Sequence, residues 1–289
     1  MEDKLIEEDI YYASLLSFIE MVKTGTVIAN DQYFMAEETI KAANEIGVRL
    51  QTTRTVNDIG ESGNQRLEEL EKLIDNYKDK FNNITLNIGI HGLYTTGKDT
   101  VKKSIELAKK YKLPVHMHFC ENTQETQDIK KEYNVERPVQ VLEELFGETH
   151  NILAHVVKVT DEEIDSLRKM NVSVVHCPVS NLRLGCGIAK VQKMLENGIN
   201  VALGTDGQGS GSNLDMFDTM KITGLLQKGE FENPKNMDAY EVLKMATING
   251  AKALKLEEKI GTVEEGKDAD LILIDLNNEV CRPIRKCFF

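Results

Sequence analysis

Short apolar runs alternate with longer segments of helical periodicity along most of the chain. The runs are rich in Val, Ile and Leu and have the length of buried strands. Between them, apolar residues recur three and four positions apart, which is typical of amphipathic helices. Seven runs are predicted to be strands, at 26–30, 48–53, 84–90, 114–121, 151–157, 172–177 and 201–203.

The alternation predicts an α/β fold, in which parallel strands are joined by right-handed helical crossovers. Seven such strands with polar residues at their ends favour a (β/α)8-type barrel over the alternative, an open sheet. Residues 261–275 predict a turn and a further strand outside the barrel. The predicted helices cover 8–23, 37–46, 67–80, 100–111, 123–133, 138–146, 161–170, 188–197, 214–227 and 238–254.

Composition narrows the class of protein. The chain has 289 residues, of which 41% are hydrophobic and 28% charged, and no apolar run approaches the roughly 20 residues that span a bilayer. Its acidic first residues contain no apolar signal core, and five scattered cysteines form no disulfide framework, so we expect a cytoplasmic protein. A net charge of -12 argues against a nucleic-acid partner. It does not bear on a small-molecule substrate, which we expect on other grounds, because local charges at a pocket can oppose the overall balance.

Polar side chains able to do chemistry end four of the predicted strands. In a barrel of alternating strands and helices the strand ends converge on one mouth, so residues distant in sequence become one pocket. Histidine and carboxylate side chains that meet there are suited to metal-assisted hydrolysis. The candidates are His118 and Glu121, His155, His176, and Asp206.

Each candidate also has a structural interpretation. A single strand histidine is more often a core residue, a Glu after a strand often caps a helix, and an Asp before Gly is common in turns. The occurrence of such residues at several strand ends favours a site for His118 and Glu121. For Asp206 alone the two interpretations are even, and for His155 spacing leaves a buried histidine bonded to the backbone as an open alternative. We expect a structural role for His176.

Four further residues are placed near the same mouth. His91 ends the strand at 84–90, and Ser210 lies in a polar loop just after Asp206. Arg54 and Arg66 could bind a carboxylate or a polyol; exposed surface arginines are the alternative. Cys120 and Cys177 lie at strand ends without zinc-finger spacing, and we expect them to be buried apolar residues.

These motifs together resemble the amidohydrolase superfamily, and within it the branch of methylthioadenosine/S-adenosylhomocysteine deaminases and chlorohydrolases. The resemblance runs from FIEMVKTGT at 18–26 to EEGKDADLILID at 264–275. Its most specific motifs are HMHFCE (116–121), ILAHVVKVTDEEI (152–164), VVHCPVSNLRLGCGIAKV (174–191) and VALGTDGQGSGSNLDMF (201–217).

The resemblance implies roles for these residues. His118 is implied as a ligand of one divalent metal ion, zinc being expected and iron or manganese the alternatives, and Asp206 as ligand and base. Glu121 is implied as proton shuttle and substrate contact, and His155 as the residue that orients the metal-bound hydroxide. The positions implied to contact a nucleoside or its carboxylate tail are Arg54, Arg66, His91 and Ser210.

The chain departs from the family at its ends. The family's first strand supplies a His-x-His pair, and no such pair precedes Glu8. We therefore expect a barrel domain at 1–255 that lacks its first strand, and at 256–289 a partial segment of the family's small β-sandwich, with truncation at both ends. Such a barrel would leave two strand edges unpaired.

The leading functional hypothesis is a metal-dependent deaminase that acts on an aminated heterocycle or nucleoside and releases ammonia. The alternatives are a catalytically inactive fragment without the metal pair, and a cyclic amidase or chlorohydrolase. We expect no membrane partner. Whether the chain forms a homo-oligomer is left open.

Overall fold

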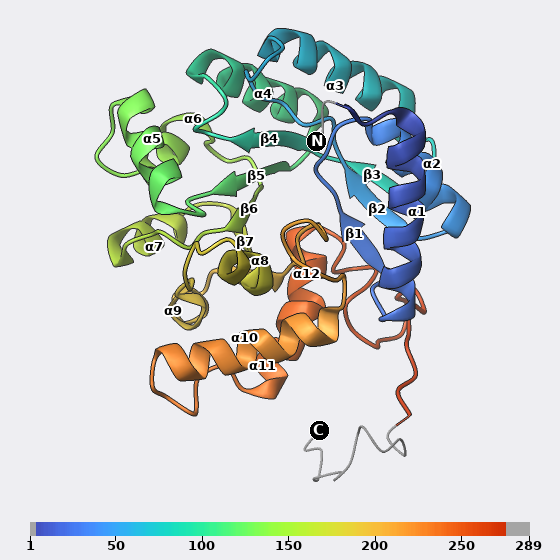
Figure 1. The fold of residues 1–289 in the computed structure, drawn as a ribbon, viewed down its shortest axis with the longest axis vertical. Coiled ribbons are helices and arrows are strands. Elements are labelled where there is room, and N and C mark those ends of the chain that lie inside the picture. The colour runs from blue at the N-terminus through green and yellow to red at the C-terminus, as the bar shows by residue number, and fades with distance from the viewer. Residues whose placement is uncertain (1–3, 276–289) are drawn as a thin grey trace.

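The computed structural model describes residues 4–275 as an α/β fold whose strands are all parallel (Figure 1). The strands form two hydrogen-bonded sheets, with the orders β1-β2-β3 and β4-β5-β6-β7-β8. Each predicted apolar run contains a strand, which confirms the strand predictions. The strands are β1 (Ile28–Asn30), β2 (Arg49–Thr52), β3 (Ile84–Leu86), β4 (Ile88–Gly92), β5 (Val115–Phe119), β6 (Asn151–His155), β7 (Val172–His176) and β8 (Asn200–Leu203).

The run predicted at 84–90 is divided at Asn87 into two strands, and this residue joins the two sheets. β3 pairs with β2, whereas β4 pairs with β5, so the chain changes partner at Asn87. The Asn87 backbone N–H donates to the carbonyl of Thr52 at 3.0 Å, and its side chain donates to Asn30 at 2.9 Å. A parallel bridge between Val56 and Ile90 continues the connection beyond this point.

Helices surround the strands on the outside (Figure 1), and most strand residues are buried. They are α1 (Glu7–Lys23), α2 (Ala36–Ile46), α3 (Gly63–Tyr77), α4 (Lys98–Tyr111), α5 (Thr123–Tyr133), α6 (Val139–Leu145), α7 (Asp161–Leu167), α8 (Pro178–Arg183), α9 (Val191–Glu196), α10 (Met216–Glu230), α11 (Ala239–Ala246) and α12 (Ile248–Ala253). Strand residues such as Leu50, Ile88, Met117 and Val201 are fully buried.

Two helical features differ from the sequence prediction. The segment predicted as one helix at 238–254 is broken at Thr247, whose φ of -126° and ψ of -95° interrupt the helical backbone between α11 and α12. The short α8 was not predicted, because its sequence has no apolar periodicity. It begins at Pro178, and proline is favoured at the first position of a helix.

The sheet formed by the described residues does not close on itself. Among these residues β1 pairs with β2 alone, and β8 pairs with β7 alone. Helix α1 links the elements on either side of this opening, because the Glu20 carboxylate accepts a hydrogen bond from the backbone N–H of Leu214, beyond β8, at 2.8 Å. No helix within 4–275 combines the length and apolar character that crossing a bilayer requires.

The strand predicted within 261–275 is absent, and that prediction is wrong. The segment pairs with none of the described strands, and Leu271 and Leu273 are exposed. Ion pairs hold the segment instead: Arg49 contacts Asp268 at 2.9 Å and Asp270 at 2.7 Å. The rest of the segment assigned to a β-sandwich, 276–289, lies outside the described residues.

Candidate functional site

His118 lies on β5 with its ring turned toward the site. Its Nδ1 is 2.6 Å from the carbonyl oxygen of His91 and donates to it, which leaves Nε2 with a free lone pair. Burial of the ring lowers the pKa of His118, and the neighbouring His155 lowers it further. The neutral imidazole is the form that ligates a metal ion.

Glu121 follows β5 at a tight turn that a second carboxylate holds in place. Glu125, which is buried, accepts hydrogen bonds from the backbone N–H groups of Cys120 at 2.8 Å and Glu121 at 2.7 Å. Cys120 has a φ of 51°, so the turn is strained and fixed by these bonds. The Glu121 carboxylate lies 3.8 Å from His155 Nδ1 and accepts a weak hydrogen bond from the Cys186 thiol at 3.5 Å.

His155 ends β6 and is almost fully buried. Its ring stacks against that of His118, with the two centroids 5.5 Å apart. Its Nδ1 lies 2.8 Å from Oδ1 of Asn181, so Nδ1 donates to the amide oxygen and Nε2 is left as an acceptor. The φ of 72° at His155 is unusual for this residue and turns the chain sharply at the strand end.

Asp206 lies just beyond β8 and is held as a carboxylate. Burial raises its pKa, but hydrogen bonds from the Ser180 hydroxyl at 2.6 Å and the Gly207 backbone N–H at 2.7 Å, with the nearby Ser210 hydroxyl, outweigh burial. The net pKa therefore lies below the ordinary aspartate value. An ionised Asp206 can accept a proton or ligate a cation.

The ends of β5, β6 and β8 thus bring four candidate residues together. The negative charges of Asp206 and Glu121 both raise the pKa of His118, although the larger effect of burial lowers it. The charge of His155 lowers the pKa of Asp206. Residues up to 88 positions apart therefore share one electrostatic environment.

His91, at the end of β4, borders this group. Its ring centroid lies 5.1 Å from that of His118, and its Nδ1 lies 2.9 Å from the Thr95 hydroxyl. Burial lowers the pKa of His91 to about 4, with smaller contributions from the charges of His118 and Arg66. His91 is therefore neutral, and Arg66 is near enough for its charge to act on this ring.

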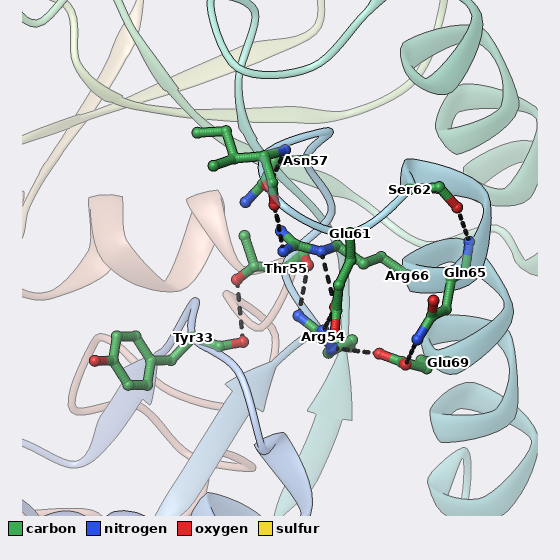
Figure 2. Close-up of polar contacts among 10 residues, drawn as sticks. Tyr33, Arg54, Thr55, Asn57, Glu61, Ser62, Gln65, Arg66 and Glu69 are labelled. Carbon is green, nitrogen blue, oxygen red and sulfur yellow. Dashed lines mark hydrogen bonds and ion pairs between the residues drawn. The ribbon is translucent and has the colours of Figure 1, made fainter. Parts of the chain in front are cut away.

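Arg54 and Arg66 lie beside the site in a dense polar cluster (Figure 2). Arg54 donates to Glu69 at 2.8 Å and to the Thr55 carbonyl at 3.0 Å. Arg66 donates to the Asn57 side chain and to a backbone carbonyl. Both arginines are mostly buried, so the interpretation as exposed surface arginines is wrong.

His176 is fully buried on β7, and neither of its ring nitrogens has a hydrogen-bond partner among the described residues. Burial lowers its pKa to about 3, as does the charge of His155 to a smaller extent. Cys120 and Cys177 are buried and free, which confirms the sequence prediction for both.

The donors present fit part of a divalent-ion site. His118 has the free Nε2 and the backbone-bonded Nδ1 that are typical of a metal-ligating histidine, and Asp206 supplies an ionised carboxylate. A catalytic zinc takes three protein ligands and an open position. Within 4–275 no group of three or more His, Cys, Asp or Glu side chains is arranged to hold an ion. The described residues alone therefore do not complete such a site.

Sequence reasoning missed the residues that orient the site. Ser180 and Asn181 are neighbours on α8, and each holds one candidate: Asp206 and His155 respectively. The signal was their place directly after the strand end at Cys177-Pro178, where a short helix can aim its side chains into the mouth. Glu125 and Cys186 gave no signal, because their roles depend on loop geometry.

The chain is similar to known proteins over nearly its whole length. Residues 2–289 match the model of the amidohydrolase family. A 5-methylthioadenosine/S-adenosylhomocysteine deaminase of Caldanaerobacter subterraneus is 41% identical over 98% of this chain and 66% of its own length. A 5'-deoxyadenosine deaminase of Methanocaldococcus jannaschii is 40% identical, over 98% of this chain and 68% of its own length. The chain thus spans about two thirds of the length of these relatives.

Solved structures show the same fold. An adenosine deaminase from Xanthomonas campestris with bound zinc superposes with a TM-score of 0.93 at 30% identity, covering 98% of this chain and 65% of that one. An atrazine chlorohydrolase from Arthrobacter aurescens in complex with zinc superposes with a TM-score of 0.85. Its identity is 24%, over 93% of this chain and 64% of that one, so it supports the fold alone.

Proposed function

The chain belongs to the amidohydrolase family, and from this premise we propose that it deaminates an adenine nucleoside modified at its 5' position, with release of ammonia. The observation that carries the proposal is the meeting of His118, Glu121, His155 and Asp206 at the ends of β5, β6 and β8. The deaminase names of two relatives that each match 98% of the chain support the substrate class.

In this proposal two carboxylates divide the proton transfers. Asp206, ionised and bonded to Ser180, takes a proton from the attacking water. Glu121, in its carboxylic acid form, gives a proton to the ring nitrogen beside the attacked carbon. Asp206 then passes the proton of the water to the amino group, the C–N bond breaks with release of ammonia, and the new hydroxyl group returns a proton to Glu121. His155, with Nδ1 fixed by Asn181, presents Nε2 as a hydrogen-bond acceptor for the same water.

The proposed cofactor is one divalent ion, zinc in the first place, with His118 and Asp206 among its ligands. The zinc bound by the structurally similar adenosine deaminase supports this choice of metal. The described residues do not supply the remaining ligands. The family resemblance assigns these ligands to a His-x-His pair.

The finer assignments of fold and setting belong to the same proposal. We propose that the strands form a (β/α)8-type barrel whose first strand would lie between β8 and β1, with the barrel at 1–255 and a separate C-terminal segment at 256–289. The unpaired edges of β1 and β8 support the position of that strand. A cytoplasmic location, a small-molecule substrate and the absence of nucleic-acid or membrane partners remain predictions.

The test is ammonia release by the purified chain. We expect turnover of 5'-methylthioadenosine, S-adenosylhomocysteine or 5'-deoxyadenosine when Zn²⁺, Fe²⁺ or Mn²⁺ is supplied, measured by a coupled ammonia assay. Glu121→Gln should lower kcat by at least about 100-fold, because general acid–base catalysis contributes about 10²–10⁴-fold. Glu132→Gln, an exposed change on α5, is the matched control and should leave kcat unchanged.

A second candidate, an inactive chain that keeps the fold, is favoured by the incomplete set of metal donors. Metal analysis of the purified protein separates the two. No stoichiometric metal, together with no ammonia from any of the three nucleosides, would remove deaminase activity as a property of this chain and leave the inactive chain as the answer.

A further inference from the structure

Glu61 lies between the two buried arginines and contacts both. Its Oε2 is 3.5 Å from Arg54 Nη2 and 3.4 Å from Arg66 Nε. Figure 2 shows Arg54 and Arg66, which come from the end of β2 and from α3, directed at this one carboxylate. A carboxylate held by two guanidinium groups is the arrangement by which proteins bind an anionic ligand.

The two contacts of Glu61 are longer than the Arg54–Glu69 contact in the same cluster. Charge-assisted hydrogen bonds are normally about 2.7–2.9 Å long, and the Arg54–Glu69 contact has that length, at 2.8 Å. Neither contact of Glu61 qualifies as a hydrogen bond, and the buried Nε of Arg66 has no hydrogen-bond acceptor among the described residues. An N–H of Arg66 is therefore available to a better placed oxygen.

The Glu61 side chain is also placed so that it can move away from the two arginines. Its side chain is 51% exposed, against 15% and 14% for the two arginines. It sits in a non-helical segment directly after Gly60, whose φ of 76° favours glycine. Asp58 anchors the segment before this point, by accepting from the backbone N–H of Gly97 at 2.7 Å, so movement of Glu61 need not disturb the fold.

The charges in the cluster balance with Glu61 in place. Arg54 and Arg66 carry two positive charges, and Glu61 and Glu69 carry two negative ones. An incoming carboxylate that displaces Glu61 would restore this balance. An uncharged group in the same place would leave the charge of the arginines uncompensated, so it would not displace Glu61. The effect of the Arg66 charge on the pKa of His91, beside His118, places the cluster next to the candidate site.

We infer that Glu61 is an internal counter-ion that occupies the carboxylate position of an anion subsite, and that it discriminates against substrates with an anionic tail. The inference rests on the proposed nucleoside deaminase function and deepens it. A nucleoside with an uncharged 5' group binds without moving Glu61, while one that ends in a carboxylate must compete with it.

The test compares two substrates in one variant. In Glu61→Gln, which keeps the shape and removes the charge, we expect the ratio of kcat/KM for S-adenosylhomocysteine over 5'-methylthioadenosine to rise about tenfold, chiefly through KM. Glu68→Gln is the matched control, because it makes the same charge change at an exposed position of α3, and it should leave the ratio unchanged. An unchanged ratio in Glu61→Gln, or an equal rise in Glu68→Gln, would overturn the inference.

A second measurement keeps the inference separate from turnover. The ¹⁵Nε resonances of Arg54 and Arg66 can be titrated with S-adenosylhomocysteine and with acetate, and no reaction is needed. In Glu61→Gln the concentration of each anion that gives half of the full change in these resonances should be at least fivefold lower than in the parent chain. Shifts at equal concentrations in both proteins would defeat the counter-ion role, even if ammonia release were observed. A lack of turnover alongside the fivefold shift would refute the deaminase proposal alone.

Discussion

Single hydrogen bonds from α8 decide how the candidate site is oriented. The bond from His155 Nδ1 to Asn181 selects one tautomer of the ring, and the bond from Ser180 to Asp206 favours the ionised carboxylate. Neither residue touches the reacting atoms in the proposed mechanism. They are positioning residues, and their loss should affect activity more than stability.

Asn181 provides the sharper test of this view. Asn181→Leu removes the acceptor at nearly constant volume, and we expect kcat to fall about 10–100-fold, as is usual when a partner that orients a site histidine is lost. Asn181→Asp keeps an oxygen acceptor and should recover at least part of the rate. Measurement of kcat for both variants across pH 5–9 checks this, and equal losses would assign Asn181 a packing role.

Asp31, just after β1, is a carboxyl whose ionisation should weaken the fold. Burial raises its pKa to about 6, and a hydrogen bond from Thr52 opposes this only in part. The folded protein thus binds the Asp31 proton more tightly than the unfolded chain does, so stability falls as pH rises from about 4 to 6 and stays lower above that range.

Asp31→Asn should therefore raise the free energy of unfolding at pH 8 by about 2 kcal/mol, since one pKa unit corresponds to about 1.4 kcal/mol and the side chain is partly exposed. At pH 4 the gain should vanish. Urea unfolding at the two pH values measures both quantities, and a gain of equal size at pH 4 would show that the charge is not its cause.

At the scale of elements, the close approach of the segment just after β2 limits which side chains β4 can tolerate. The Gly89 backbone N–H donates to the Thr53 hydroxyl at 2.9 Å, and a Cβ at Gly89 would lie 2.2 Å from the Thr53 methyl group. Gly89→Ala should lower the free energy of unfolding by about 1–3 kcal/mol, because it overpacks a buried contact. Thermal and urea unfolding provide the measurement.

Gly229 supplies the control for that change. It lies in α10, and a Cβ there would meet nothing within 4 Å. Gly229→Ala should not destabilise the protein and should gain up to about 1 kcal/mol, the usual helix-propensity difference. If both variants lost the same stability, crowding at Gly89 would not be the explanation.

The elements that sequence predicted are those specified by local pattern. Val-, Ile- and Leu-rich runs give the strands, because parallel strands buried on both faces need continuous apolar sequence. The division at Asn87 was not predictable, since it depends on which strand each half pairs with. The strand predicted within 261–275 did not form for the same reason: its apolar residues pair with none of the described strands.

The candidate site divides in a similar way. His118, His155 and Asp206 were predicted to gather because the ends of parallel strands meet at one edge. Asn181 and Glu61 were not predicted to matter, because their positions follow from a six-residue helix and an irregular loop, which leave no periodic trace in the sequence.

At the scale of the whole molecule, buried histidines should set the response to acid. Burial lowers the pKa of His116 and His176 to about 3, whereas both would titrate near 6.5 in an unfolded chain. The unfolded chain therefore binds more protons below pH 6.5. The contribution of these two residues to stability is complete above pH 6.5 and is lost as the pH falls toward 3.

His176→Leu isolates one of these contributions. Between pH 6 and 4 its free energy of unfolding should fall less steeply than that of the parent chain, by about 1.4 kcal/mol per pH unit, the value for one proton. Urea unfolding at several pH values checks the difference in slope. Parallel slopes would mean that His176 is already protonated in the folded protein.

The change of partner at Asn87 has a consequence for cooperativity. Arg54 follows β2 of the three-stranded sheet, whereas the five-stranded sheet carries His118 on β5, His155 at the end of β6 and Asp206 after β8. A ligand bound by both groups of residues would contact both sheets. It would therefore couple two sheets that otherwise share few backbone hydrogen bonds. Amide hydrogen exchange should then slow in both sheets at once on binding, and the two should unfold as a single foldon.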